Sequence, residues 1–313
     1  MEYIAKSIKE KALSLNLDNT IYGTIAEIGG GQETARAFFQ AGGASGTVAK
    51  SISAYDKTFS DVLYCKGLKA GRYVSEDRLG KMLEKEYSEL VHLLDKSMEP
   101  ATRFFAFANT VETLNYYKDN EGHGWIGVRF QLTAGGLPNE VVVHVRLLEN
   151  DGLLQQYTLG ALGVNLLYAC FYYTSRPEKF LLSLLDNLSN DRLEITMARM
   201  SGPDLDYVDN RLLSVQLVKN GMTPAVFFNR KGQVMEPDEM LYKKNLLALR
   251  GSFRPITYVG IDMLKSAYAL FKNEPGFDKD NSLTLCEITL NNLLAGDQFN
   301  ERDFLDQIGR AHV

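Results

Sequence analysis

Cysteine is scarce in this sequence, and the cysteines lie far apart. Cys65, Cys170 and Cys286 are the only ones among 313 residues, and none belongs to a CxxC pair. This number and spacing argue against a disulfide framework and against a zinc site. They are typical of a protein in a reducing compartment, so we expect a cytoplasmic protein.

Long apolar runs are also missing. The most apolar segment, residues 159–173, is shorter than the roughly 18–20 residues that a membrane-spanning helix needs. Residues 1–13 carry interspersed charges instead of an apolar core, which argues against a secretory signal peptide. The sequence therefore predicts a soluble protein without a membrane partner.

No large excess of charge of one sign is present. The formal net charge is −5 at pH 7, which gives no electrostatic basis for binding nucleic acid. The apolar content of 45% is typical of a globular chain that buries a core. The length suits one large domain or two closely packed α/β domains over residues 1–307. If there are two, we expect the boundary near residues 150–175, although no linker marks it.

Residues 308–313, Ile-Gly-Arg-Ala-His-Val, resemble a translated sequencing-library adapter. We therefore expect a non-native tail there and a native chain that is truncated at this point. His312 then has no functional meaning. His92, His123 and His144 remain as the histidines available for chemistry.

The hydrophobic pattern predicts a mixed α/β fold. Residues 20–28 read as an apolar strand and residues 33–40 as a helix, with three consecutive glycines between them. This is a Rossmann-like strand–glycine loop–helix arrangement. The next segment, residues 47–64, is ambiguous, and its apolar spacing favours a helix.

Two further patterns complete the predicted fold. Residues 122–132 and 140–148 alternate between apolar and polar side chains, and a loop with glycine and proline joins them, which indicates an antiparallel hairpin. Residues 193–200, 208–219 and 225–228 read as strand, helix and strand. This order predicts a βαβ unit with a parallel strand pair.

The glycine loop is the first candidate site. Gly29, Gly30, Gly31 and Gln32 precede a helix, whose first N–H groups and positive dipole end suit a phosphate. The triplet matches neither GxGxxG nor GxxxxGK[ST], and Glu27 would repel an anion. The alternative is a tight strand-to-helix turn without a ligand.

The hairpin is the second candidate. A register that places its apolar side chains on one face gathers polar side chains on the other. That face carries His123, Trp125 and Arg129 near His144 and Arg146. These side chains could hold an anion, with His123 as general acid or base. The alternative is a polar sheet face exposed to water.

Two other segments are weaker candidates. Asp204, Asp206 and Asp209 follow a predicted strand and could bind Mg²⁺, but we interpret them as caps and first-turn acids of the next helix and predict no metal site. Arg250 and Arg254 flank a Gly-Ser pair and form either a phosphate clamp or an ordinary turn.

Four segments carry a resemblance to a known group of proteins: residues 27–33, 46–56, 122–125 and 250–255. Through them the chain resembles a bacterial family of uncharacterised proteins, from about Tyr22 to Gln307. Family members are longer, which agrees with a truncated chain. Inconsistent labels, nicotinate-nucleotide adenylyltransferase and TonB-dependent receptor, accompany such sequences.

These labels imply features that the chain lacks. An adenylyltransferase of that class would show HxGH close after its first strand, where the motif binds ATP phosphates. No histidine closely follows Ile28, and Gly122-His123 lies far downstream, with Asn120 in place of the first histidine. A TonB-dependent receptor would be a barrel with a signal peptide. A nucleotidyltransferase is therefore implied by the label alone.

We expect an enzyme or enzyme-like protein that binds a nucleotide or another small anionic, phosphorylated metabolite. The predicted catalytic residue is His123, and the predicted ligand-binding residues are Gly29, Gly30, Gly31, Gln32, Arg129, Arg250 and Arg254. One alternative is a non-catalytic regulatory or scaffold protein. Another is an S-adenosylmethionine-dependent methyltransferase, because residues 27–31 are similar to its first motif. The sequence identifies no cofactor and no oligomeric state.

Overall fold

A six-stranded mixed sheet forms the centre of the molecule. The computed structural model describes residues 3–66, 71–94, 96–251, 253, 257–289, 300–302, 304 and 305. The strand order is β2-β1-β3-β4-β5-β6; β1 runs parallel to β2 and β3, and the remaining neighbours are antiparallel. The strands are β1 (Ile21–Ile28), β2 (Val48–Ile52), β3 (Arg103–Glu112), β4 (Gly122–Phe130), β5 (Asn139–Leu147) and β6 (Leu193–Ser201). The predicted mixed α/β class is confirmed.

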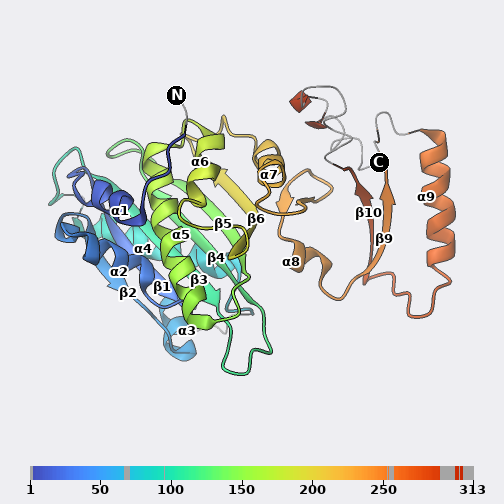
Figure 1. Cartoon of the computed structure of the whole chain (residues 1–313), viewed down its shortest axis with the longest axis horizontal. Coiled ribbons are helices and arrows are strands. Elements are labelled where there is room, and N and C mark those ends of the chain that lie inside the picture. Colours follow the sequence, from blue (N-terminus) through green and yellow to red (C-terminus); the bar gives the residue numbers. More distant parts are fainter. Residues whose placement is uncertain are drawn as a thin grey trace.

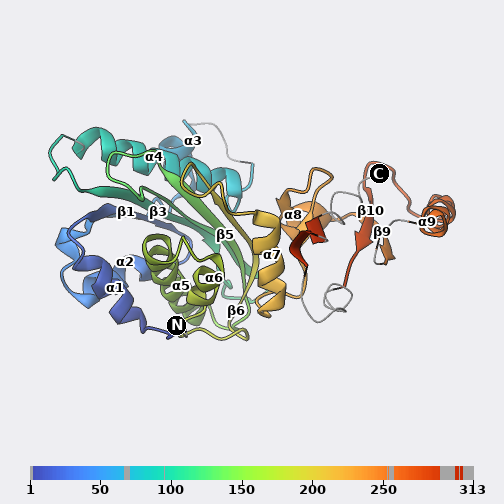
Figure 2. The same cartoon turned by 90° about the horizontal axis from the view of Figure 1, so that it is seen from above.

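Helices cover both faces of this sheet (Figure 2). On one face lie α1 (Ile8–Asn16), α2 (Glu33–Ala41), α5 (Gly152–Tyr172) and α6 (Pro177–Leu184). On the other lie α3 (Lys57–Cys65) and α4 (Glu76–Leu94). Most of α5 is buried in the larger core, because its sequence is apolar on nearly all sides. This helix occupies most of the range 150–175, where a domain boundary was expected.

The predicted hairpin is confirmed as β4 and β5. The register pairs Val128 with Val141 and Ile126 with Val143, and all four side chains are buried in the core beneath α5. Since strand side chains alternate between faces, the intervening positions point to the α3 and α4 side. Trp125 is buried there.

The predicted βαβ unit at residues 193–228 is wrong. After β6 and α7 (Asn210–Lys219), β7 (Phe227–Phe228) pairs antiparallel with β8 (Val234–Met235) in a separate two-stranded sheet. After α7, the chain returns to the side of β6, where Ile195 N–H donates to the Met222 carbonyl at 3.0 Å. Pro224 follows and has no N–H to donate, so a ladder cannot continue there.

The helix favoured over residues 47–64 is also partly wrong. This segment contains β2 before α3, and between them Asp56 caps α3 by accepting from Phe59 N–H at 2.8 Å. Residues 48–52 form a strand because they pair with β1. Their local propensity is ambiguous and does not predict this pairing. The parallel βαβ unit of the main sheet is therefore β1–α2–β2.

A second parallel unit lies to one side of the main sheet (Figure 1). It comprises β9 (Asn245–Arg250), α9 (Tyr258–Phe271) and β10 (Ser282–Glu287). Two short helices complete the order of elements: η1 (Ala44–Gly46) lies between α2 and β2, and α8 (Pro237–Leu241) precedes β9. β9 and β10 pair in parallel and share no strand with the six-stranded sheet. Within the described ranges, no helix has the length and apolarity to cross a bilayer. The expected non-native tail lies outside the described residues.

Candidate functional site

The N-terminus of α2 already holds a carboxylate of the chain itself. Glu27 Oε2 accepts from Ala35 N–H at 3.0 Å and Oε1 accepts from Thr34 N–H at 3.2 Å, while Asn109 Nδ2 donates to Oε1 at 3.3 Å. Glu27 is only 1% exposed. Burial raises the pKa of this carboxyl, whereas these hydrogen bonds act in the opposite direction. Glu27 therefore occupies two of the first N–H groups of α2, those of Thr34 and Ala35.

The glycine triplet fits closely against neighbouring elements. Gly29 has φ +88°, and a Cβ there would lie 1.8 Å from the Val111 carbonyl oxygen at the end of β3. A Cβ on Gly30 would lie 2.7 Å from Leu159 Cδ1 of α5. These contacts explain why glycine is needed without any ligand. The geometry thus favours a turn at Gly29 to Gly31, with Gln32 exposed beside it.

Two histidines meet on the opposite face of the sheet. His123 Nδ1 lies 3.3 Å from His144 Nε2. His144 Nδ1 in turn lies 2.6 Å from Thr196 Oγ1 and 3.4 Å from Glu236 Oε1. The Trp125 ring packs against the His144 ring, with the two centroids 4.7 Å apart. We call His123, His144, Thr196 and Glu236 the histidine relay.

The strands set this geometry. Register places Trp125 opposite His144, so His123, two residues earlier, lies on the same face of β4. On β6 the pairing shifts between His144 and Val145, and Thr196 is the extra residue of this bulge. A bulge redirects a side chain, and here the Thr196 hydroxyl lies against the His144 ring.

Both rings are held in the neutral form near pH 7. Burial is the largest cause and lowers the pKa of His144 to about 3, with the neighbouring His123, Arg146 and Arg72 acting in the same direction. Burial also lowers the pKa of His123, against the opposing effect of Glu112 and other nearby acids. His123 remains half-buried, whereas His144 is 1% exposed. His123 is therefore the accessible end of the relay.

The structure does not bring Arg129 to His123, and it pairs Arg146 with acids. Arg129 lies at the far end of β4, where its guanidinium contacts Glu84 at 2.9 Å and Glu140 at 3.3 Å. Arg146 lies opposite His123 in the register, but its guanidinium contacts Glu121 at 3.3 Å and Glu194 at 3.4 Å. These charges are compensated, so the face lacks the expected pair of arginines ready for an anion.

Arg250 and Arg254 are also separate from the glycine turn. Arg250 ends β9, and its Nη2 contacts Glu287 Oε1 of β10 at 2.7 Å. This unit lies apart from α2 in Figure 1. Arg254 lies outside the described residues.

The capping interpretation of the acidic segment before α7 holds for Asp209 alone, because the first turn of α7 contains no acidic residue. Asp209 is the N-cap of α7 and accepts from Arg211 N–H at 2.9 Å. Asp204 accepts from Asn139 Nδ2 at 2.8 Å. Within the described part of the chain, no group of three or more His, Cys, Asp and Glu side chains could hold a metal ion.

Comparison with known proteins finds similarity only among solved structures. No protein-family model matches the sequence, and neither does any curated protein. The competence/damage inducible protein CihA from Agrobacterium tumefaciens aligns at 18% identity and a TM-score of 0.37, over 54% of this chain and 98% of that one. A CinA-superfamily protein from Enterobacter cloacae aligns at 11% identity and a TM-score of 0.38, over 54% of this chain and 96% of that one. Another CinA-superfamily protein, from Escherichia coli, aligns at 16% identity and a TM-score of 0.36, over 60% of this chain and 95% of that one. These similarities assign no residue a role in this chain.

Proposed function

We propose that the chain is a bacterial cytoplasmic enzyme in which His123 transfers a proton to or from a small polar substrate. The observation that carries this proposal is the contact of His123 with the buried His144. The Thr196 and Glu236 oxygens near His144 Nδ1 favour the proton at that nitrogen. His144 Nε2 then accepts from His123 Nδ1–H, and Nε2 of His123 carries the lone pair of a general base.

Charges around His123 favour a neutral or cationic substrate. Glu112, Glu121 and Asp238 are the acids that act on the His123 ring, whereas Arg72 is the base that does so. A phosphorylated substrate would meet repulsion from these carboxylates. The anionic ligand expected from the sequence therefore has less support at this site than a neutral or cationic one.

Metabolite conversion tests the proposal. The purified protein is incubated with a bacterial small-molecule extract, and mass spectrometry identifies compounds that are consumed. We expect His123→Gln to slow consumption by about 10²–10⁴-fold, the usual contribution of general acid–base catalysis. The matched control is His92→Gln, which removes an exposed histidine of α4 and should retain the wild-type rate. Equal rates for the two variants, or no consumption by the wild type, would overturn the proposal.

A second candidate is binding of a nucleotide or phosphorylated metabolite by the β9–α9–β10 unit. The parallel pairing of β9 with β10 favours it, because α/β proteins bind ligands at the carboxyl ends of parallel strands. The first turn of α9 contains no acidic residue, in contrast to the Glu27-occupied start of α2. Arg250 ends β9. The nucleotidyltransferase label would apply to this unit rather than to the glycine triplet.

Thermal shift with ATP, AMP and inorganic phosphate tests the second candidate. A ligand at 100 times its Kd stabilises by about 2.7 kcal/mol. We expect the shift to disappear in Arg250→Ala and to persist in Gln32→Ala, which alters the exposed residue of the glycine turn. A shift that persists in Arg250→Ala and disappears in Gln32→Ala would instead place the binding site at the glycine turn. If no compound binds and none is consumed, the regulatory or scaffold interpretation is favoured. S-adenosylmethionine has no supporting contact, because Glu27 is buried against α2.

A further inference from the structure

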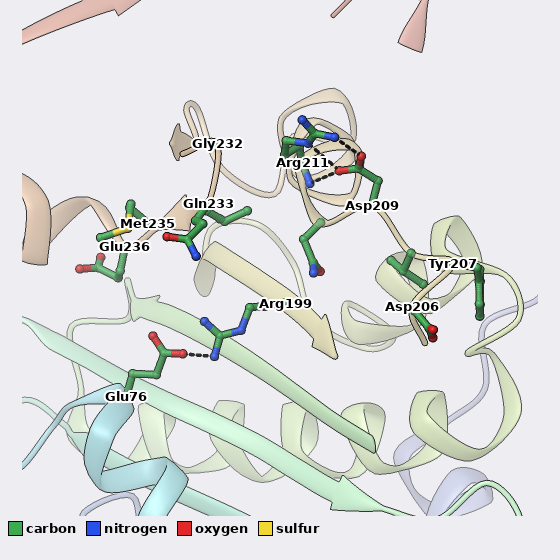
Figure 3. Close-up of a pocket in the computed structure, with 13 residues that line it drawn as sticks. Glu76, Arg199, Asp206, Tyr207, Asp209, Arg211, Gly232, Gln233, Met235 and Glu236 are labelled. Atoms are coloured by element: carbon green, nitrogen blue, oxygen red, sulfur yellow. Dashed lines mark hydrogen bonds and ion pairs between the residues drawn. The ribbon is translucent and has the colours of Figure 1, made fainter. Parts of the chain in front are cut away.

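An open cavity of about 720 Å³ lies beside β6, α7 and β8 (Figure 3). Its volume falls in the range of about 300–1,000 Å³ that small-molecule sites occupy. Its lining combines carboxylates, guanidinium groups and an aromatic ring from four separate segments of the chain. Its polar and charged lining includes Glu76, Arg199, Asp206, Tyr207, Asp209 and Arg211.

Besides Glu236, which lies 3.4 Å from His144 Nδ1, two of the lining carboxylates have partners in the structure. Asp209 caps α7 and also accepts from Arg211 Nε at 3.0 Å and from Arg211 Nη2 at 2.6 Å. Glu76 pairs with Arg199 through Nη2 alone. Asp209 and Arg211 therefore satisfy each other. Arg199 keeps further donors, and its side chain is 36% exposed.

Asp206 differs from these two acids. Across the part of the chain that the structure describes, its carboxylate makes no hydrogen bond or ion pair, although it lines the same cavity. The next residue, Tyr207, is anchored by its hydroxyl, which donates to the Thr174 carbonyl at 2.5 Å. The loop that carries Asp206 is thus fixed at the edge of the cavity.

We propose that this cavity binds a zwitterionic, amino-acid-like metabolite. Asp206 would accept from the ligand's ammonium group, and the remaining donors of Arg199 would bind its carboxylate, the anion that a guanidinium fits best. These two residues come from different walls, Arg199 from β6 and Asp206 from the loop before α7 (Figure 3). A ligand with both charges uses both walls, whereas a simple amine or a simple acid uses one.

The cavity adjoins the histidine relay, so the relay reports on its occupancy. Glu236 lines the cavity, and its Oε1 lies 3.4 Å from His144 Nδ1. Binding is therefore expected to shift the His144 ring resonances in NMR spectra. The proposal does not depend on catalysis by His123.

Calorimetry on the full chain tests the proposal. The probes are the proteinogenic L-amino acids, followed by two analogues of the tightest one: the amine that lacks the carboxylate and the N-acetyl derivative that lacks the ammonium. We expect at least one amino acid to bind and both analogues to bind at least tenfold more weakly. Binding of neither the amino acids nor the analogues, or equal binding of an analogue, would overturn it.

Matched variants locate the site. Asp206→Asn changes one exposed carboxylate and should weaken binding at least tenfold, while Glu99→Gln changes an exposed carboxylate away from the cavity and should not. Arg199→Met should weaken binding of the amino acid but not of the amine. Unchanged affinity in Asp206→Asn would place the ligand elsewhere and contradict the proposal.

Discussion

At the scale of single residues, the histidine relay shows how burial changes the chemistry of ordinary side chains. An imidazole in water titrates near pH 6.5, but burial holds His144 neutral well below that value. The same burial would make a protonated ring costly, even with Glu236 nearby. His123 is less buried and contacts solvent, so the pair combines a fixed inner ring with an accessible outer ring.

Acid should destabilise the protein through His144. Its folded pKa of about 3 lies below its unfolded value near 6.5, so between these values the unfolded chain binds more protons. Stability is therefore lost as pH falls from about 6.5 towards 3. From pH 6.5 to 5, we expect the loss to reach about 2 kcal/mol. Urea denaturation of wild type and His144→Gln measures this difference, and equal pH slopes would contradict it.

The sequence predicted part of this site and missed the rest. Strand alternation was enough to place His123 and His144 on one face, because the period of a strand is two residues. Arg129 shares that face but not that end of the strand. Thr196 required the bulge and Glu236 required a long-range contact, and neither leaves a local signal in the sequence.

At the scale of elements, the strand-to-helix turn at Gly29 depends on tertiary contacts as much as on backbone freedom. The sequence pattern correctly identified the strand, the turn and the helix. It could not show that β3 and α5 press against the glycines. Similarly, Pro224 was visible in the sequence, but its effect on β7 depends on where the chain runs relative to β6.

A comparison of Gly29 with Gly42 separates the energetic cost of backbone strain from the cost of a steric overlap. Gly29 and Gly42 have nearly equal φ values, +88° and +89°, but a Cβ on Gly42 would meet nothing within 4 Å. Each change to alanine should cost about 1–3 kcal/mol for the positive-φ backbone, which at Gly42, with ψ +157°, is a region almost restricted to glycine. Gly29→Ala should cost about 1–3 kcal/mol more, because its Cβ would overlap the Val111 carbonyl. Chemical denaturation of both variants gives the comparison, and similar losses would contradict it.

At the scale of the whole molecule, two units of different character are joined in one chain. The main sheet is covered on both faces and encloses the large cores (Figure 2). In the β9–α9–β10 unit, α9 has no buried residue, and Tyr258, Val259 and Leu270 are largely exposed. A two-stranded sheet is marginal without a packed face.

Hydrogen exchange should therefore differ between the units. Amides of β3, β4 and β5 lie in the centre of the main sheet, and we expect them to exchange only on global unfolding. Amides of α9, β9 and β10 should exchange at least about 10³-fold faster, since local opening exposes little additional apolar surface. Mass spectrometry after deuterium labelling measures both rates. Equal protection would show that the two units unfold together.

The Glu27 carboxylate at the start of α2 acts as a tethered ligand in its own receptor. It is linked to its binding site through the chain, so its effective concentration is far above that of any dissolved anion. One substitution would vacate a ready-made anion receptor. We expect sulfate to stabilise Glu27→Ala but not Glu33→Ala, which removes a first-turn acid that is not bound to these N–H groups. A single substitution at Glu27 would therefore make the α2 N–H groups available to an anion from solution, which the present chain prevents.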